Sequence, residues 1–234
     1  EFMYLLTETA SPFALERWAA FFANFGQFAK GFFYTLGISI GALIVALLLG
    51  LIFGAMSSTH NKVLRGISRV YVEIFQNTPL LVQFVVVFYG ISILTDGHIM
   101  IPISLTAILC VGVYTGAYIS EIIRTGIEAV PKGQTEAALS QGFTYADTMR
   151  IIILPQAVRT ILPPLTNQVV NLIKNTSTVA IISGADIMFT AKAWAYDTTN
   201  YVPAFAGAAF LYFIMCFPLA TWARRKEEEN KKAY

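Results

Sequence analysis

The sequence predicts an all-α integral membrane protein with five transmembrane helices. Hydrophobic residues make up 56% of its 234 residues and charged residues only 13%, which leaves too few charges to cover a soluble domain. The charges also cluster between long apolar runs instead of recurring along every element. The basic clusters then decide how often the chain crosses, because Lys and Arg gather on the cytoplasmic side of a membrane.

A spanning helix needs about 20 mostly apolar residues, and several runs of the chain meet that requirement. They are Phe32–Met56, Val70–Leu94, Pro102–Ile123 and Tyr201–Trp222. The first run carries glycines four residues apart, a spacing that permits another helix to approach closely. The pairs are Gly37 with Gly41 and Gly50 with Gly54.

A further crossing, Ile151–Ile182, is required by the basic residues although its hydropathy is poor. The basic residues follow the first run (Lys62, Arg65, Arg69), follow the third run (Arg124, Lys132, Arg150) and fill the tail (Arg224, Arg225, Lys226, Lys231, Lys232). These segments fall on one side of the membrane only if residues 151–182 cross it. We therefore expect five spans, with the N-terminus outside and the C-terminus in the cytoplasm.

The ends of the chain are expected to lie outside the bundle. Glu1 and Phe2 ahead of Met3 resemble a cloning remnant, and we expect no cleavable signal peptide. Aromatic residues within 11–31 predict an amphipathic helix at the outer interface, or simply an aromatic belt that anchors the first span. The expected organisation is an N-terminal segment (1–30), a transmembrane domain (31–223) with a cytoplasmic loop (131–155), and a charged cytoplasmic tail (224–234).

Several chemistries have no support in the sequence. The net charge of +2 is too small to suggest a nucleic-acid partner. Cys110, Cys216, His60 and His98 form neither a disulfide framework nor a metal site. No glycine-rich loop ends in Lys-Ser or Lys-Thr, so we expect no nucleotide hydrolysis, no catalytic residues and no cofactor in this chain.

The cytoplasmic loop carries the signals of two short helices. Pro131 is expected to end the third span, and "KGQTEAALSQG" to form a helix with Glu136 in its first turn, where a carboxylate suits the helix dipole. Gly142 is a plausible residue to end this helix in left-handed conformation. Ala137 and Ala138 would give it a flat face that another backbone can approach.

The second helix of the loop begins with a capping signal. Thr144 with Asp147 three residues on resembles a capping box, and the helix would run into "RIIILP". Pro155 then interrupts helix geometry at the membrane boundary. We predict a helix–turn–helix that protrudes on the cytoplasmic side.

The spacing of residues in this loop resembles a known signature. Glu136-Ala137-Ala138, three residues, Gly142, nine residues, Ile152, one residue and Leu154-Pro155 match the EAA signature of ATP-binding-cassette (ABC) importer permeases without a gap. Three longer stretches resemble the polar amino-acid branch of that family. They are "EIFQNTPLLVQ" (Glu73–Gln83), "AYISEIIRTGIEAVPKGQ" (Ala117–Gln134) and "LPQAVRTILPPLTNQVVNLIKNTS" (Leu154–Ser177).

The resemblance, which covers roughly Gly31–Trp222, implies a fold, a function and partners. It implies the five-span core of a type I importer, in which a coupling helix docks in a groove of a separate ATPase. It also implies two permease subunits, two cytoplasmic ATPases that bind ATP and Mg, and an external amino-acid-binding protein. The membrane would be a prokaryotic plasma membrane and the substrate a polar amino acid of the glutamine or glutamate type. The residues assigned to coupling are Glu136, Ala137, Ala138, Gly142, Leu154 and Pro155.

Polar stripes within the spans predict a substrate pathway. Lipid would not accept such stripes, because an unpaired polar group in hydrocarbon costs several kcal/mol. Helical spacing places Asn167, Asn171 and Lys174 on one face of the fourth span, while Pro79 in the second span could loosen its helix. The residues assigned to the pathway are Asn77, Thr78, Tyr118, Glu121, Asn167, Asn171, Lys174 and Asn175.

Glu121 has two interpretations, because an ionisable residue within a span is either paired or functional. It could form a structural ion pair with Arg124 or with Lys174. It could instead bind the ammonium of the substrate while Lys174 or nearby amides bind the carboxylate. Asp186 and Asp197 could line a docking surface for the binding protein or could be solvated loop residues.

Other functions fit the sequence less well. A self-sufficient ion-coupled carrier or channel, with Glu121 as the coupling carboxylate, would not need the coupling-type loop, and we see no duplicated halves. An intramembrane enzyme would need a nucleophile–base pair or a metal cluster. A non-transporting scaffold would not explain polar stripes on several spans.

Overall fold

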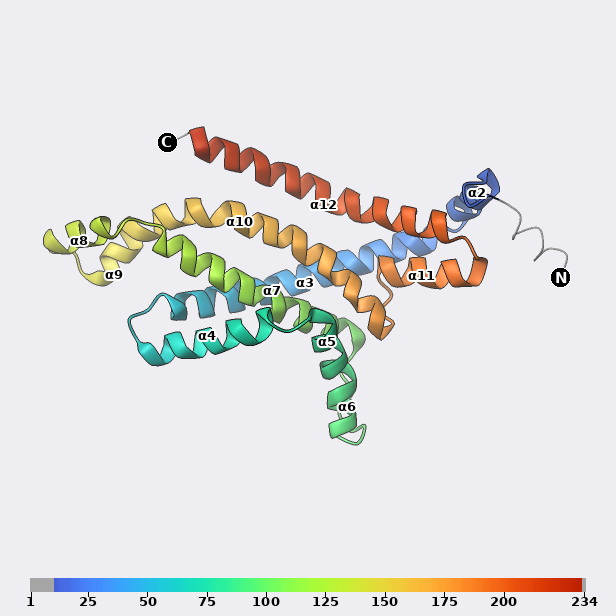
Figure 1. Ribbon diagram of the computed structural model, residues 1–234, viewed down its shortest axis with the longest axis horizontal. Coiled ribbons are helices and arrows are strands. Elements are labelled where there is room, and N and C mark those ends of the chain that lie inside the picture. The colour runs from blue at the N-terminus through green and yellow to red at the C-terminus, as the bar shows by residue number, and fades with distance from the viewer. Residues whose placement is uncertain (1–10, 233–234) are drawn as a thin grey trace.

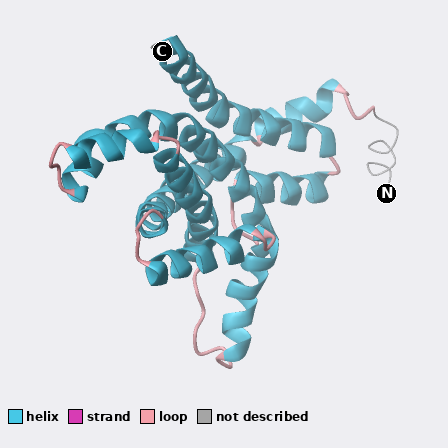
Figure 2. Ribbon diagram, turned by 60° about the vertical axis from the view of Figure 1, so that its left-hand side comes forward, coloured by secondary structure: helices cyan, strands magenta, loops and turns pink. Residues whose placement is uncertain are grey.

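The computed structural model describes residues 11–232, and helices make up nearly all of that part of the chain (Figures 1 and 2). The long helices lie roughly lengthwise beside one another, and α8 and α9 protrude at one end (Figure 1). The elements are α2 (Leu15–Ala23), α3 (Phe25–Ser57), α4 (Lys62–Gln76), α5 (Leu80–Val85), the π-helical η1 (Val86–Gly90), α6 (Ile91–Leu94), α7 (Ile103–Glu128), α8 (Lys132–Ser140), α9 (Tyr145–Asp147), the π-helical η2 (Thr148–Ile153), α10 (Leu154–Asn175), the 3₁₀-helical η3 (Thr176–Ile182), α11 (Ile187–Thr198) and α12 (Tyr201–Lys232). The expectations for residues 1–10 and 233–234 lie outside the described residues.

The centre of the bundle is the contact between α3 and α7. Small residues let the two backbones approach closely: a Cβ on Gly50 would lie 2.4 Å from Cγ2 of Ile119, and one on Gly112 would lie 2.7 Å from Cβ of Val45. Gly41 and Gly54 are similarly crowded by α7 side chains, whereas Gly37 has nothing within 4 Å. The glycine spacing therefore predicted the contact at three of its four positions.

By length and composition, three helices of the described residues qualify as membrane spans: α3, α7 and residues 201–226 of α12. A fourth qualifies if α4 and residues 80–94 count as one broken span. The helix α10 is not among them, as its polar composition led us to expect, but it packs along α7 and α12 (Figure 1). The apolar runs therefore predicted the positions of α3, α7 and α12, although each of these helices extends beyond its run.

The prediction of one continuous span over Val70–Leu94 was wrong. The helix begins earlier, at Lys62, and the chain turns by 97° between α4 and α5. The turn falls at Asn77–Pro79, because Pro79 has no N–H to continue the hydrogen bonding of α4. The second span is thus a broken helix whose two halves leave the break in different directions (Figure 1).

The expected amphipathic helix at the N-terminal end is present but shorter than predicted. It is α2, and residues 25–31 already belong to α3. Phe21 and Phe28 are buried against Trp194 of α11, with ring centroids 6.0 and 5.7 Å from it. The Arg17 guanidinium donates to the carbonyl of Thr199 at 2.9 Å. Part of the aromatic cluster therefore packs inside the protein, while Phe13 and Phe22 stay exposed.

The expectation that Asp186 is a surface or loop residue was wrong. Its side chain is fully buried and caps α11, accepting from the backbone N–H of Met188 at 3.0 Å and of Phe189 at 3.1 Å. The hydroxyl of Tyr212 on α12 donates to the same carboxylate at 3.2 Å. Asp186 thus joins the start of α11 to α12, whereas Asp197 is exposed as expected.

Candidate functional site

The protruding loop has the predicted helix–turn–helix form. The first helix, α8, begins directly after Pro131 and ends in the turn at Gly142, whose φ of +87° lies in the left-handed region. The N–H of Gly142 donates to the carbonyl of Leu139 at 3.0 Å, and the N–H of Phe143 to that of Ala138 at 3.1 Å. These two bonds satisfy carbonyls that a helix end would otherwise leave free, so Gly142 fixes how α8 stops.

One detail of the first helix was predicted wrongly. Glu136 is the fifth residue of α8 and not in its first turn, because Pro131 serves as the N-cap and the helix begins at Lys132. The helix dipole therefore acts on it less than expected. Of the two alanines, Ala138 is buried where α8 packs on η2, whereas Ala137 and Leu139 are exposed. Of the nine residues of α8, only Thr135 and Ala138 are not exposed, so most of the surface of this helix is open.

The second helix of the hairpin starts at the predicted cap. Thr144 Oγ1 accepts from the backbone N–H of Asp147 at 3.2 Å, and its hydroxyl hydrogen-bonds the Asp147 carboxylate at 2.6 Å. Helix α9 continues through the π-helical η2 into α10, with Pro155 in the first turn of α10. Pro155 cannot donate a backbone hydrogen bond, as expected, but it does not end the helix, which continues to Asn175. The hairpin is thereby joined to α10 without a break in helical structure.

A second segment supports the hairpin from the side. The His60 ring lies in the short connection between α3 and α4, and it packs edge-to-face on the Tyr145 ring of α9, with centroids 5.2 Å apart. Neither residue was singled out by the sequence, because the contact joins segments 85 positions apart in the chain. It links the α3–α4 turn to the base of the hairpin formed by α8 and α9.

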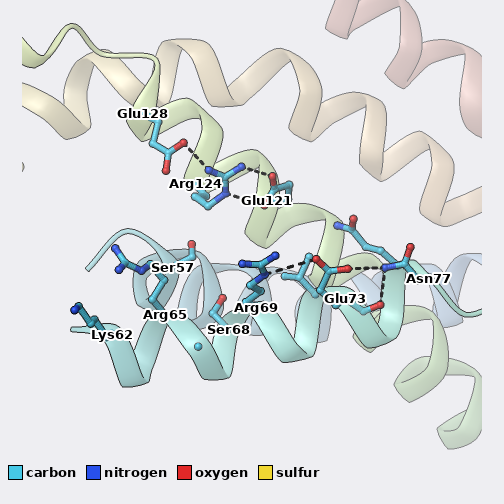
Figure 3. Close-up of a pocket in the computed structure, with 13 residues that line it drawn as sticks. Ser57, Lys62, Arg65, Ser68, Arg69, Glu73, Asn77, Glu121, Arg124 and Glu128 are labelled. Carbon is cyan, nitrogen blue, oxygen red and sulfur yellow. Dashed lines mark hydrogen bonds and ion pairs between the residues drawn. The ribbon is translucent and has the colours of Figure 1, made fainter. Parts of the chain in front are cut away.

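A polar cavity of about 620 Å³ lies between α4 and α7 (Figure 3). It reaches from Ser57 and Lys62, beside the α3–α4 turn, to Gln76 and Asn77 at the break of the second span. Helix α4 has one apolar face, which is exposed, and one charged face, which lines the cavity. The cavity therefore runs along α4 from the α3–α4 turn to the break of the second span.

The side of the cavity formed by α7 is organised by one arginine. Arg124 donates from Nε to Glu121 at 2.9 Å, and its terminal nitrogens bind the carboxylates of Glu121 and Glu128 (Figure 3). Of the two ion pairs proposed for Glu121 from the sequence, the structure has the one with Arg124. All three side chains are part-exposed along the cavity, so water or a ligand can reach them.

The residues assigned to the pathway are not gathered in one place. Asn77 and Glu121 line the cavity between α4 and α7. Tyr118 hydrogen-bonds Tyr114 at 3.1 Å, and the Thr78 hydroxyl donates to the Ile74 carbonyl at 2.8 Å. Asn167 and Asn171 are exposed along α10, and Asn175 is half-buried at its end.

Lys174 lies at a different site from Glu121. It lines a separate pocket of about 280 Å³ between α10, α11 and α12, together with Ser177, Met188, Phe205 and Tyr212. The sequence placed Lys174 and Glu121 opposite each other because helical spacing shows only which residues share a face. It does not show which neighbouring helix that face meets.

The sequence also failed to single out several residues of the cavity. Arg65, Arg69 and Glu128 line it, but we had counted the arginines only as markers of the cytoplasmic side. A signal was available, because Lys62, Arg65, Arg69 and Glu73 recur at three- and four-residue steps and so share one helical face. A charged face of this kind within a span indicates a polar cavity, and not only which end of the helix lies in the cytoplasm.

The apolar helices, the hairpin at one end and the polar cavity along a broken span fit a membrane permease. The chain belongs to the family described as binding-protein-dependent transport system inner membrane components, which it matches over residues 46–227. It is 37% identical over 216 residues to the probable glutamine ABC transporter permease protein GlnM of Bacillus subtilis (strain 168), covering 91% of this chain and 97% of that protein.

Two further proteins agree with this assignment. The chain is 34% identical over 208 residues to the glutamate/aspartate import permease protein GltJ of Escherichia coli (strain K12), covering 81% of this chain and 85% of that protein. A solved chain described as an amino acid ABC transporter with histidines superposes with a TM-score of 0.83 at 31% identity, covering 91% of this chain and 98% of that chain. The protein is thus the permease subunit of a type I ABC importer, a transport component that works with a separate ATPase.

Proposed function

We propose that this permease carries a polar amino acid of the glutamine or glutamate type into a prokaryotic cell, across the plasma membrane. The relatives support the substrate class, since they are described as glutamine and glutamate/aspartate permeases. The cavity between α4 and α7 supports it too, because its lining of both charge signs suits a zwitterion. An external binding protein delivers the amino acid, and a second permease subunit completes the pathway.

The coupling hairpin transmits the ATPase cycle in this proposal. Its tip docks in the ATPase through the exposed surface of α8, and Gly142 sets the angle at which α8 leaves the hairpin. Because α9, η2 and α10 form one continuous helical rod, a displacement of the hairpin moves α10. The single observation that carries the coupling role is this rigid, capped hairpin beyond the end of the bundle (Figure 1).

The proposed topology follows from the same arrangement. The hairpin faces the cytoplasm, together with the α3–α4 turn that contacts it through His60 and Tyr145. The N-terminus then lies outside and the C-terminus inside, with α10 as the fifth crossing. Its exposed Asn167 and Asn171 face the second permease subunit or the water-filled space between the subunits, because lipid would not accept them.

The test is co-purification in lipid nanodiscs with the ATPase subunit encoded nearby. Adenosine triphosphate hydrolysis is measured with and without candidate binding proteins and a panel of amino acids. We expect a stable complex whose hydrolysis rises severalfold with one binding protein and its amino acid. A chain that binds no ATPase and instead takes up amino acid in response to a proton or sodium gradient would be an ion-coupled carrier, contrary to the proposal.

A further inference from the structure

The cavity between α4 and α7 has two walls of opposite net charge. Three cations and one carboxylate of α4 line it (Lys62, Arg65, Arg69 and Glu73), which leaves two positive charges in excess. Two carboxylates and one guanidinium of α7 line the facing wall (Glu121, Glu128 and Arg124), which leaves one negative charge in excess. Figure 3 shows Arg69 and Glu73 on the side of α4 that faces Glu121 and Arg124 of α7.

The positive wall holds cations that no carboxylate neutralises. Among the described residues, the ion pairs of the cavity are Arg69–Glu73, Arg124–Glu121 and Arg124–Glu128. Arg65 therefore lines the cavity without a carboxylate partner. Arg69 meets Glu73 at 3.8 Å, with side chains 81% and 59% exposed, so that pair is loose and readily exchanged for another anion.

Arg124 orients the two carboxylates of the negative wall but leaves some of their acceptor positions free. Arg124 binds Glu121 and Glu128 together, so the two carboxylates stand about one helical turn apart on each side of it. A carboxylate has about four acceptor positions, and Arg124 occupies only some of them. Each carboxylate can therefore also accept from an ammonium group in the cavity.

We propose that this cavity binds the transported amino acid with its α-carboxylate on Arg65 and Arg69 of α4 and its α-ammonium on Glu121 and Glu128 of α7. The inference rests on the proposed function and adds the orientation of the substrate and the residues that set it. A guanidinium binds a carboxylate through two parallel hydrogen bonds, which favours arginine for this role. The volume of about 620 Å³ lies within the range of about 300 to 1,000 Å³ that is usual for small-molecule sites.

This orientation replaces Lys174 as the partner of the carboxylate. Lys174 lines the pocket beside Phe205 and Tyr212, whereas Glu121 and Glu128 line the other cavity, so Lys174 does not share a site with the α7 carboxylates. Arg65, Arg69 and Glu121 line one cavity. The two poles of a zwitterion can be satisfied there together, which matters because a charged group that loses water without gaining a partner is costly.

The experiment uses the permease–ATPase complex in phosphatidylcholine nanodiscs without binding protein, so that only the permease selects the ligand. Labelled L-glutamine is compared with 4-aminobutanamide, which lacks the carboxylate, and with N-acetyl-L-glutamine, which lacks the ammonium. The double variant Arg65→Gln/Arg69→Gln should bind L-glutamine at least tenfold more weakly and 4-aminobutanamide equally well. Glu121→Gln should weaken L-glutamine and leave N-acetyl-L-glutamine unchanged. Arg225→Gln, which removes a cytoplasmic cation outside the cavity, is the matched control.

Several outcomes would overturn the inference while leaving the importer intact. Equal weakening of L-glutamine and 4-aminobutanamide would mean that the arginines shape the cavity without binding the carboxylate. Unchanged L-glutamine binding in the double variant would remove the α4 site. If the wild-type complex binds none of L-glutamine, L-glutamate or L-histidine, the cavity is not a binding site for the transported amino acid. Binding abolished in nanodiscs that contain phosphatidylglycerol would assign the arginines to lipid phosphate. In each case, hydrolysis stimulated by the binding protein would still support the proposed function.

Discussion

The side-chain amide of Gln83 lies 3.3 Å from the carbonyl oxygen of Phe75, where an unbroken helix would place the N–H of residue 79. Pro79 has no N–H to supply, and the Gln83 amide takes that place. The same nitrogen also donates to the carbonyl of Thr78 at 3.3 Å and to its hydroxyl at 2.8 Å. One side chain thus satisfies backbone groups on the far side of the break in the second span.

We therefore predict that Gln83→Met, which keeps the length of the side chain but removes the amide, destabilises the broken span. The Phe75 carbonyl is part-buried, and a net hydrogen bond contributes about 0.5 to 1.5 kcal/mol, so the apparent melting temperature should fall by a few degrees. Stimulated hydrolysis should fall with it, because the break borders the cavity at Asn77. Gln156→Met is the matched control, since that amide bonds only the Ile152 carbonyl. Equal effects of the two changes would contradict the special role of Gln83.

The contact of α3 with α7 gives a prediction about stability. A methyl group on Gly50 would overlap Ile119, whose Cγ2 and Cβ would lie 2.4 and 2.6 Å away. Overpacking of this kind costs about 1 to 3 kcal/mol, so Gly50→Ala should lower the melting temperature of the protein in nanodiscs. Gly37→Ala is the control on the same helix, because nothing lies within 4 Å of that position. A Gly50→Ala protein as stable as Gly37→Ala would show that the helices can move apart freely.

The proposed coupling role of the hairpin formed by α8 and α9 gives a prediction about energy transfer. A non-glycine residue in left-handed conformation costs about 1 to 2 kcal/mol, and Asn tolerates it better than Ala. Gly142, at a φ of +87°, should therefore show a graded series in which Gly142→Ala lowers stimulated hydrolysis severalfold and Gly142→Asn lowers it less. Gly133→Ala lies within α8 in open space and should match the wild type. Melting temperatures should stay close in all of these variants, because the hairpin projects beyond the bundle.

The sequence predicted this hairpin well because its signals are local. Gly142 and the Thr144 cap act within a few residues, so their types alone specify the turn. The start of α8 at Lys132 was predicted correctly, and only the placement of Glu136 in its first turn was wrong. The spans were found from hydropathy for a similar reason, because each apolar run is continuous in the chain.

The cavity could not be predicted in the same way, because it depends on which helix faces which. The choice between Arg124 and Lys174 as the partner of Glu121 was settled only by the packing of α10. Pro79 predicts a break in the second span, but the angle of 97° depends on how α5 packs against α7 and η3. Asp186 was misplaced because a carboxylate between apolar spans suggests a surface loop, and only the tertiary structure brings Tyr212 to it.

Asp186 gives a prediction about pH. Burial raises the pKa of its carboxyl to about 6, despite hydrogen bonds from the N–H groups of Phe189 and Met188 and from the Tyr212 hydroxyl, each of which lowers it. The ordinary value is about 3.9, so the folded protein holds the proton more tightly than the unfolded chain. The contribution of this group to the free energy of unfolding is therefore largest below about pH 4, and it falls as the pH rises through about 6.

Asp186→Asn should accordingly raise the melting temperature at pH 7.5, keep about half of that advantage at pH 5, and lose it below about pH 4. Asn keeps an acceptor oxygen for the start of α11 and carries no charge to bury. Each pKa unit corresponds to about 1.4 kcal/mol, so the gain at pH 7.5 is at most about 3 kcal/mol. Asp186→Ala removes the cap as well, which costs about 0.5 to 2 kcal/mol, and it should be less stable than Asp186→Asn at both pH values. Asp197→Asn, at an exposed position, is the control and should change neither measurement. A melting temperature that Asp186→Asn leaves unchanged, or lowers, at pH 7.5 would mean that the carboxylate is stabilised in the folded protein by more than its three hydrogen-bond donors.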